Sequence, residues 1–156
     1  MAIYMKIDGV EGNVTQKGYE GWIEVLEYGW MAVRSIANRT GSMKNRSASS
    51  ASVGELEVRK LLDEASPKLV MEALQGQQGK TVNLHVVDGP SDRKVVEYTL
   101  SNTLISSYDC AGKGDRPRES LALNFSKIEI KVTPYNEDNQ AGSPQTIAYD
   151  LVAAAG

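Results

Sequence analysis

Hydrophobic and polar residues alternate along most of this chain of 156 residues. The clearest run extends from Val96 to Tyr108, where all the hydrophobic residues except Ile105 hold even positions and predict one continuous buried face. Alternation with a period of two is typical of β-strands that bury one face and expose the other. Alternating runs lie at 3–7, 22–36, 55–62, 81–87, 96–108, 121–132 and 147–151. The pattern therefore predicts a mainly β fold.

The run at 121–132 changes phase in its middle. Its hydrophobic residues hold odd positions up to Phe125 and even positions from Ile128 onward. A slip of one residue sends every later side chain to the opposite face of a sheet. We therefore expect a bulge or corner near Ser126 and Lys127, where a long strand turns from one sheet into another.

A single short α-helix is predicted over about residues 67–75. Ser66 is a favourable N-cap, Pro67 suits the first helical position, and Gly76 is expected as the left-handed residue that ends the helix. One stripe of this helix carries Leu69, Val70, Ala73 and Leu74. Many strands with one short helix are typical of a small β-barrel of two sheets with the helix at its flank. The length favours a single domain over residues 1–156.

The segment at about 37–54 differs in composition from the rest of the chain. It holds five serines, two glycines, three basic residues and no acid. Because the whole chain has a net charge of −3 and this segment carries +3, the remaining residues carry −6. A long extended loop of this kind is usually functional or mobile. We expect either a cationic arm that contacts another copy of the protein or a solvated flexible loop.

The composition excludes several classes of site and partner. The net charge of −3 argues against non-specific binding to nucleic acid, which depends on neutralising phosphates. One cysteine and one histidine cannot form an internal disulfide or the familiar Cys/His zinc sites, so no cofactor or metal is expected. No apolar run approaches the roughly 20 residues that span a bilayer, so no membrane insertion is expected. The first residues do not form a signal peptide, since no basic leader precedes an apolar run.

Candidate catalytic residues are few, and none is supported by a motif. His85 lies on the polar side of its predicted strand, where a hydrogen-bonded structural role is favoured. Cys110 follows an aspartate and has no histidine nearby in the sequence, which favours an inert thiol. Tyr28 and Trp30 share one face and could stack on a ligand, although packing is the commoner use of such residues. A catalytic role is not expected, and a monomeric β-barrel that binds a ligand is the alternative function.

Several segments together resemble one known family. They are residues 21–30, the serine- and glycine-rich segment that leads up to residues 53–56, and residues 63–69 and 120–129. Their order and sequence resemble the Hcp family, the haemolysin-coregulated tube proteins of bacterial type VI secretion, and the likeness runs nearly from end to end. No single motif in it is as specific as a metal-ligand pattern.

The resemblance implies a structural tube component. Members of the family fold as a small β-barrel with one flanking helix and form homo-hexameric rings. The rings are assembled in the bacterial cytoplasm and stack into a tube that a contractile sheath drives out of the cell, beneath a VgrG-type spike. Small secreted effectors can bind in the ring lumen, where the protein acts as their carrier or chaperone. Secretion then proceeds through the type VI apparatus without a signal peptide.

The resemblance also implies where one interface lies. Residues 37–54 match the extended loop of the family, which reaches an adjacent ring or subunit. Acidic residues on a neighbouring copy would complement its basic residues, although the sequence does not identify them. Met43 is suited to an adaptable apolar contact. The interface residues expected in this loop are Arg39, Ser42, Met43, Lys44, Arg46 and Ser47.

Overall fold

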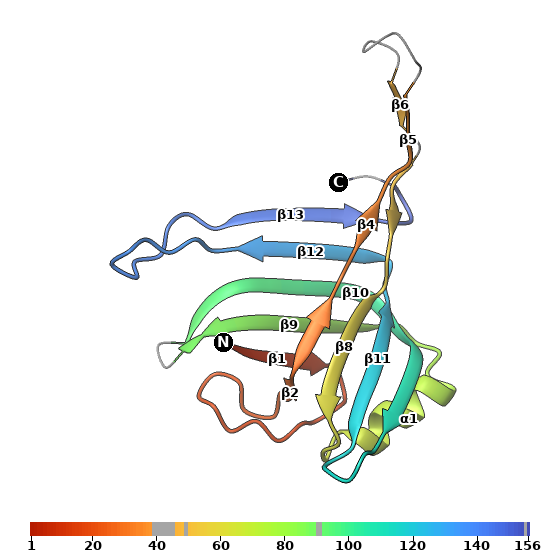
Figure 1. The fold of residues 1–156 in the computed structure, drawn as a ribbon, viewed down its shortest axis with the longest axis vertical. Coiled ribbons are helices and arrows are strands. Elements are labelled where there is room, and N and C mark those ends of the chain that lie inside the picture. Colours follow the sequence, from red (N-terminus) through yellow and green to blue (C-terminus); the bar gives the residue numbers. More distant parts are fainter. Residues whose placement is uncertain (39–45, 49, 90–91, 155) are drawn as a thin grey trace.

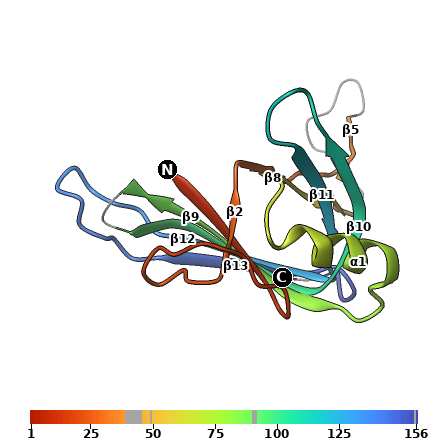
Figure 2. The same cartoon turned by 90° about the horizontal axis from the view of Figure 1, so that it is seen from below.

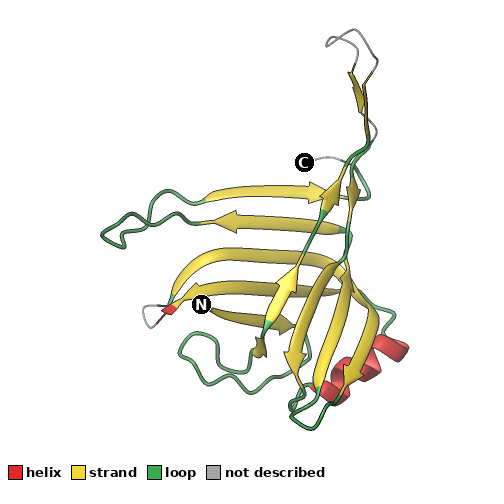
Figure 3. Ribbon diagram, in the orientation of Figure 1, coloured by secondary structure: helices red, strands yellow, loops and turns green. Residues whose placement is uncertain are grey.

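Strands make up most of the fold, and one short helix lies at its edge (Figure 3). The computed structural model describes residues 1–38, 46–48, 50–89, 92–154 and 156. The elements follow one another as β1 (Ala2–Ile7), β2 (Ile23–Val25), β3 (Glu27–Gly29), β4 (Ala32–Val33), β5 (Ile36–Asn38), β6 (Arg46–Ala48), β7 (Ser52–Val53), β8 (Leu56–Leu61), α1 (Ser66–Gln75), β9 (Lys80–Asp88), β10 (Arg93–Ala111), β11 (Arg118–Asn124), β12 (Lys127–Val132) and β13 (Gln145–Asp150). The predicted mainly β fold with one short helix is confirmed.

Two antiparallel sheets share the long strand β10 (Figures 1 and 2). The larger sheet has the order β2-β1-β9-β10-β12-β13, and the smaller sheet has the order β10-β11-β8-β3. The first half of β10 pairs with β9 and β12, and its second half pairs with β11. One strand of 19 residues therefore holds the two layers together.

The predicted barrel is not closed by strand pairing. The hydrogen-bonded order has β2 at one end and β3 at the other. These two strands are nonetheless consecutive in the chain, with only Leu26 between them, and the Leu26 N–H donates to the carbonyl oxygen of Arg59 at 2.8 Å. The sheet is thus curled so that its two ends meet through the chain itself.

The inward-facing side of β10 changes at Asn102. Leu100 is fully buried, but the buried residue after the bend is Thr103, and Leu104 is partly exposed. Asn102 has a φ of +52°, a left-handed conformation that asparagine tolerates better than most residues, and the pairing with β9 shifts register here. The continuous even face predicted for this run is therefore wrong beyond Leu100. A second register shift, between Ile105 and Ser107, accompanies the change of partner to β11.

The phase slip at residues 125–128 marks the passage from one sheet to the other, as predicted. β11 pairs with β8 and β10, whereas β12 pairs with β10 and β13. Phe125 and Ile128 are both buried, although they have opposite parity. The pairing stops at Asn124 and resumes at Lys127, so the predicted single long strand is two strands.

The start and end of α1 differ from the prediction. Pro67 lies in the first turn as expected. Ser66 is the first helical residue rather than the cap, because Ala65 holds the N-cap position and makes no side-chain capping bond. Gly76 has φ −61° and ψ 120°, so it is extended and not left-handed. Glycine is needed there for space, since a Cβ would lie 2.5 Å from the carbonyl oxygen of Glu72.

The apolar stripe predicted for α1 is only partly covered by the sheets. Leu69 is 0% exposed and belongs to the core, and Val70 and Ala73 are half-buried. Leu74 is 73% exposed, so its predicted burial is wrong. The helix carries more apolar surface than its own chain covers.

The space between the sheets is filled by hydrophobic side chains. The residues with 0% exposure include Met5, Ile23, Leu56, Val58, Leu84, Leu100 and Leu123. Tyr28 and Trp30 pack against this core, and the Tyr28 and Tyr98 hydroxyl oxygens lie 3.2 Å apart. A packed interior of this kind argues against the alternative of a ligand-binding barrel.

The burial of α1 gives a test within a single helix. Replacing Leu69 by Ala removes core contacts and should lower the free energy of unfolding by about 2–5 kcal/mol. Replacing Leu74 by Ala should change it by no more than about 0.5 kcal/mol, because that side chain is solvated. Urea unfolding in dilute solution measures both values. Equal losses for the two variants would show that α1 is seated differently.

Candidate functional site

A narrow arm, described over residues 31–38, 46–48 and 50–54, projects from the sheets along the long axis of the molecule (Figure 1). Ala32 pairs with Val53 in the β4–β7 ladder, and Ala37 pairs with Ser47 in the β5–β6 ladder. At the base, the Gly54 N–H donates to the carbonyl oxygen of Met31 at 2.7 Å. The segment predicted as an extended loop is therefore a two-stranded ribbon wherever the structure describes it.

The described part of the arm exposes hydrophobic side chains. Met31 is 64% exposed, and Val33 and Ile36 are also largely exposed. The chain contains no acid between Glu27 and Glu55 but has four basic residues there. Apolar side chains on a thin cationic ribbon cannot be buried by the ribbon itself, so this surface is suited to contact with a partner.

The predicted interface residues fall mostly beyond what can be described. Arg39, Ser42, Met43 and Lys44 lie outside the described residues. Arg46 and Ser47 lie in β6, where the Arg46 backbone pairs with Asn38 and the Ser47 backbone pairs with Ala37. Their role at an interface stays a prediction.

A second candidate contact surface is the edge of the larger sheet. Within the described residues, β13 pairs with β12 on one side and has no strand partner on the other. Ile147 in its middle is 67% exposed, and Val132 on β12 is also exposed. The larger sheet extends past the smaller one at β12 and β13 (Figure 2). An uncovered edge strand is a template for pairing with another chain.

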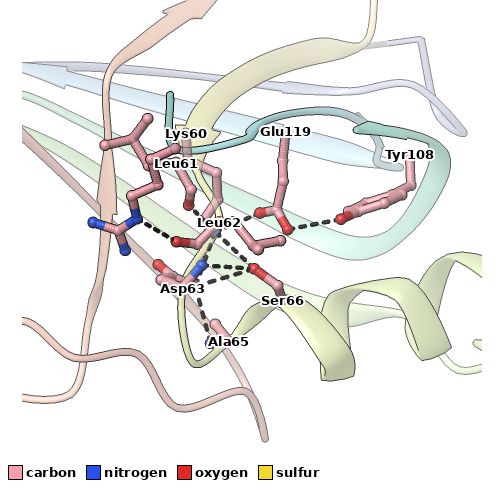
Figure 4. A network of polar contacts seen from close by, with 9 residues as sticks. Lys60, Leu61, Leu62, Asp63, Ala65, Ser66, Tyr108 and Glu119 are labelled. Atoms are coloured by element: carbon pink, nitrogen blue, oxygen red, sulfur yellow. Dashed lines mark hydrogen bonds and ion pairs between the residues drawn. The ribbon is translucent and has the colours of Figure 1, made fainter. Parts of the chain in front are cut away.

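A buried polar network joins the smaller sheet to the start of α1 (Figure 4). Lys60 and Glu119 are both 0% exposed, and Nζ of Lys60 lies 2.5 Å from Oε2 of Glu119. The same ammonium lies 2.9 Å from Oδ1 of Asp63. The Tyr108 hydroxyl donates to the other oxygen of Glu119 at 2.7 Å. The network thereby connects β8, β10 and β11 with the turn before α1.

The charges in this network are fixed. Burial by itself would raise the pKa of Glu119, but hydrogen bonds from Lys60, Ser66 and Tyr108 outweigh it and hold that pKa below its usual value. Burial and the contact with Glu119 raise the pKa of Tyr108. The carboxylate therefore stays ionised and the phenol stays protonated near neutral pH. This is the behaviour of a structural cluster rather than of an acid–base pair.

This network was not predicted, although the positions of Lys60 and Glu119 within their strands indicate it. Lys60 shares the parity of Leu56 and Val58, and Glu119 shares the parity of Leu121 and Leu123. Both charged residues thus occupy inward positions of strands whose other inward residues are hydrophobic. Two opposite charges at inward positions of paired strands indicate a buried ion pair.

Breaking the pair should cost more stability than removing it. Lys60→Met leaves Glu119 buried without its cation and should lower the free energy of unfolding by about 3–5 kcal/mol. The double variant Lys60→Met, Glu119→Leu should recover part of that loss, because the unpaired charge of Glu119 is removed while Asp63 still lacks its cation. Urea unfolding of the two single variants and the double variant tests this. A double variant whose loss equals the sum of the single losses would exclude coupling between the residues.

His85 is held in an aromatic cluster on the outer face of the larger sheet. The hydroxyl of Tyr19 lies 3.0 Å from Nδ1 of His85, and the Trp22 ring centre lies 4.8 Å from that of His85. Burial raises the pKa of Tyr19 to about 12, so its phenol stays protonated near neutral pH. Nε2 of His85 lies 3.7 Å from Oε1 of Glu97. His85 is therefore hydrogen-bonded on the outer face of the sheet.

The pKa of His85 is lowered. Burial is the main cause; Lys94 and Lys131 act in the same direction, and Glu97 opposes them. The folded protein thus binds a proton at His85 less readily than the unfolded chain does. The associated stability is complete above the unfolded pKa of about 6.5 and is lost as the pH falls below it.

The loss of stability at lower pH can be assigned to His85 because the chain has only one histidine. We expect the free energy of unfolding to decrease between pH 7.5 and pH 5.5. In the variant His85→Phe, which keeps an aromatic ring at this position, the curve should be flat over the same range. Thermal unfolding at several pH values would decide the matter. A slope that persists in the variant would assign the pH dependence to other groups.

His85 and Cys110 are not brought together. In the strand register, His85 is paired with Tyr4 and Glu97. Cys110 is paired with Glu119 at the far end of β10, and its side chain is exposed. Among the residues that the structure describes, no three His, Cys, Asp or Glu side chains are grouped so that they could hold a metal ion. Helix α1 has 10 residues, and no helix in the described part of the chain is long and apolar enough to cross a membrane.

Comparison with known proteins identifies the class to which this fold belongs. The family described as "Type VI secretion system effector, Hcp" matches residues 4–132. The protein hcp1 of Pseudomonas aeruginosa is 26% identical over 155 residues, which cover 96% of this chain and 94% of that protein.

Solved structures show the same similarity. A structure of a type six secretion system protein has a TM-score of 0.90 and 27% identity, and the match covers 98% of this chain and 97% of that one. Hcp1 from Salmonella typhimurium has a TM-score of 0.81 and 24% identity, with 99% and 97% covered. The fold is thus that of a type VI secretion protein. The chain belongs to the Hcp family and has the role of a tube and effector protein of type VI secretion. The family is a structural, secreted one.

Proposed function

We propose that the chain forms homo-hexameric rings that stack into the inner tube of a type VI secretion apparatus. A free edge at β13 and a projecting arm are two separate surfaces on one subunit. A contact between unlike surfaces of successive subunits closes into a ring if the rotation closes, and otherwise extends as a filament. The β13 edge with Ile147 supports the contact that closes a ring, and the arm supports the contact that extends a stack of rings. The free edge together with the arm is the observation that carries this proposal.

Membership of the family supports the remaining steps of the proposal. The rings assemble in the cytoplasm, surrounded by the contractile sheath and topped by a VgrG-type spike, and leave the cell with the tube. Small effectors are carried in the ring lumen. The protein acts by shape and contact and has no catalytic step, which agrees with the structural roles of His85 and of the Lys60–Glu119 pair. The single domain spans residues 1–156.

The assembly can be tested by light scattering and electron microscopy of the purified protein. We expect a mass of six chains, ring-shaped particles and, at higher concentration, longer stacks. Charge reversal by Lys44→Glu with Arg46→Glu should remove the stacks and leave the rings, because the arm loses its positive charge. A protein that is monomeric at every concentration would overturn the proposal. Unchanged stacks in the variant would exclude the arm from the contact between rings.

A further inference from the structure

The free edge of β13 presents a defined set of backbone groups. The Leu151 N–H donates to the carbonyl oxygen of Ser126 at 2.8 Å, which continues the pairing of β13 with β12. Backbone groups of successive residues in a strand point to opposite sides. The odd-numbered residues therefore point toward β12, and the N–H and C=O groups of Thr146, Ala148 and Asp150 point to the open side. These three residues are the ones that a pairing strand would engage.

The chain reverses direction directly after β13. Oδ1 of Asp150 accepts the N–H of Val152 at 2.9 Å and that of Ala153 at 3.1 Å, so one carboxylate holds the start of a turn. Ala154 has a φ of +50°, a left-handed conformation that alanine rarely adopts. We call residues 150–154 together with Gly156 the tail turn.

The tail turn brings Gly156 to the open side of β13. A Cβ on Gly156 would lie 3.2 Å from the carbonyl oxygen of Ala148, which is one of the groups that point to that side. In Figure 1 the end marked C lies beside β13, on the side away from β12. Neighbouring strands of a sheet lie about 4.8 Å apart. Gly156 therefore occupies the space that a strand paired with Ala148 would need.

The tail turn is held weakly in this place. Val152 is 85% exposed, and Ala153, Ala154 and Gly156 are exposed as well. These residues bury little apolar surface, so the hydrophobic effect contributes little to their position. The two hydrogen bonds to Asp150 are the polar contacts that hold the turn. A segment with so few buried contacts opens at low cost in free energy.

The other half of the edge is open. Ile147 is 67% exposed, and Gln145 and Thr146 are exposed too. A neighbouring strand can therefore begin to pair at Thr146. It must displace Gly156 before it can reach Ala148.

We propose that the tail turn is an autoinhibitory cap on β13, which a neighbouring subunit displaces when it pairs with this edge. This inference rests on the proposed ring, in which the β13 edge makes the contact that closes the ring. The cap opposes pairing by a strand that engages only part of the edge. It also disfavours pairing between two β13 edges, which would form a closed dimer and remove both subunits from ring formation.

A reversible disulfide tests the cap. Cys110→Ser removes the native thiol, and Ala148→Cys with Gly156→Cys places two thiols where the structure brings the residues together. Mild oxidation in dilute solution should join them within one chain, which peptide mass spectrometry detects. We expect the oxidised protein to lose ring formation, measured by light scattering, and to regain it when a reductant is added.

The matched control carries Cys110→Ser alone and is oxidised and reduced in the same way. Its rings should form equally well under both conditions, because it has no thiol left to join. Thiols in the test variant that do not join within one chain would overturn the cap. An oxidised test variant that forms rings as readily as the reduced one would overturn it too.

Substitutions of Asp150 give an independent measure. Asp150→Ala removes both hydrogen bonds that hold the turn, so rings should form about five- to thirtyfold faster after dilution from urea. Asp150→Asn removes the same charge but keeps an oxygen that accepts the same two N–H groups, so its rate should stay near that of the unmodified protein. Equal rates for all three proteins would exclude the turn as a brake on assembly.

The cap and the proposed function fail in different ways. Absence of rings in the unmodified protein would overturn the proposed function, and the autoinhibitory role with it. Rings that form in the unmodified protein, at a rate that neither the disulfide nor Asp150→Ala changes, would overturn the cap alone and leave the proposed function intact.

Discussion

The structure depends on one constraint, which is that β10 belongs to two sheets at once. In this strand the side that faces the core changes where it passes from one layer to the other. The change occurs at Asn102, whose left-handed backbone and the register shift beside it move the buried position from Leu100 to Thr103. Gly79 allows the bend, since a Cβ there would fall within 1.8 Å of Oδ1 of Asn102. The two layers, the core between them and the seat of α1 all follow from this bend.

Local pattern was enough to predict most strands, from period-two alternation, the helix, from its terminal residues and apolar stripe, and the change of sheet after Phe125. The single run at 22–36 is instead divided into the short strands β2, β3, β4 and β5. Local pattern failed where tertiary contacts decide. The inward face of β10 could not be read past Asn102, because hydrophobicity does not record a change of backbone conformation. Gly76 was assigned a left-handed role that glycine often has, whereas here it makes room for Glu72. The exposure of Leu74 could not be predicted, since a stripe on a helix does not reveal how much of it the chain will cover.

The sequence predicted that the arm is a contact surface but did not predict its structure. The basic, acid-free segment indicated a contact surface, and the pairing of its base into two ladders adds stiffness that composition does not show. The most polar buried group, Lys60 with Glu119, is fully paired. His85 is likewise held by contacts within the fold, with the Tyr19 hydroxyl and the Trp22 ring.

The position of α1 opposite the arm has a consequence for the finished tube. In a tube whose rings all faced the same way, one mouth would present the arms and the other would present helices with exposed Met71 and Leu74. A partner that binds one mouth would then meet a different surface at the other, so the two ends of such a tube would be open to separate control.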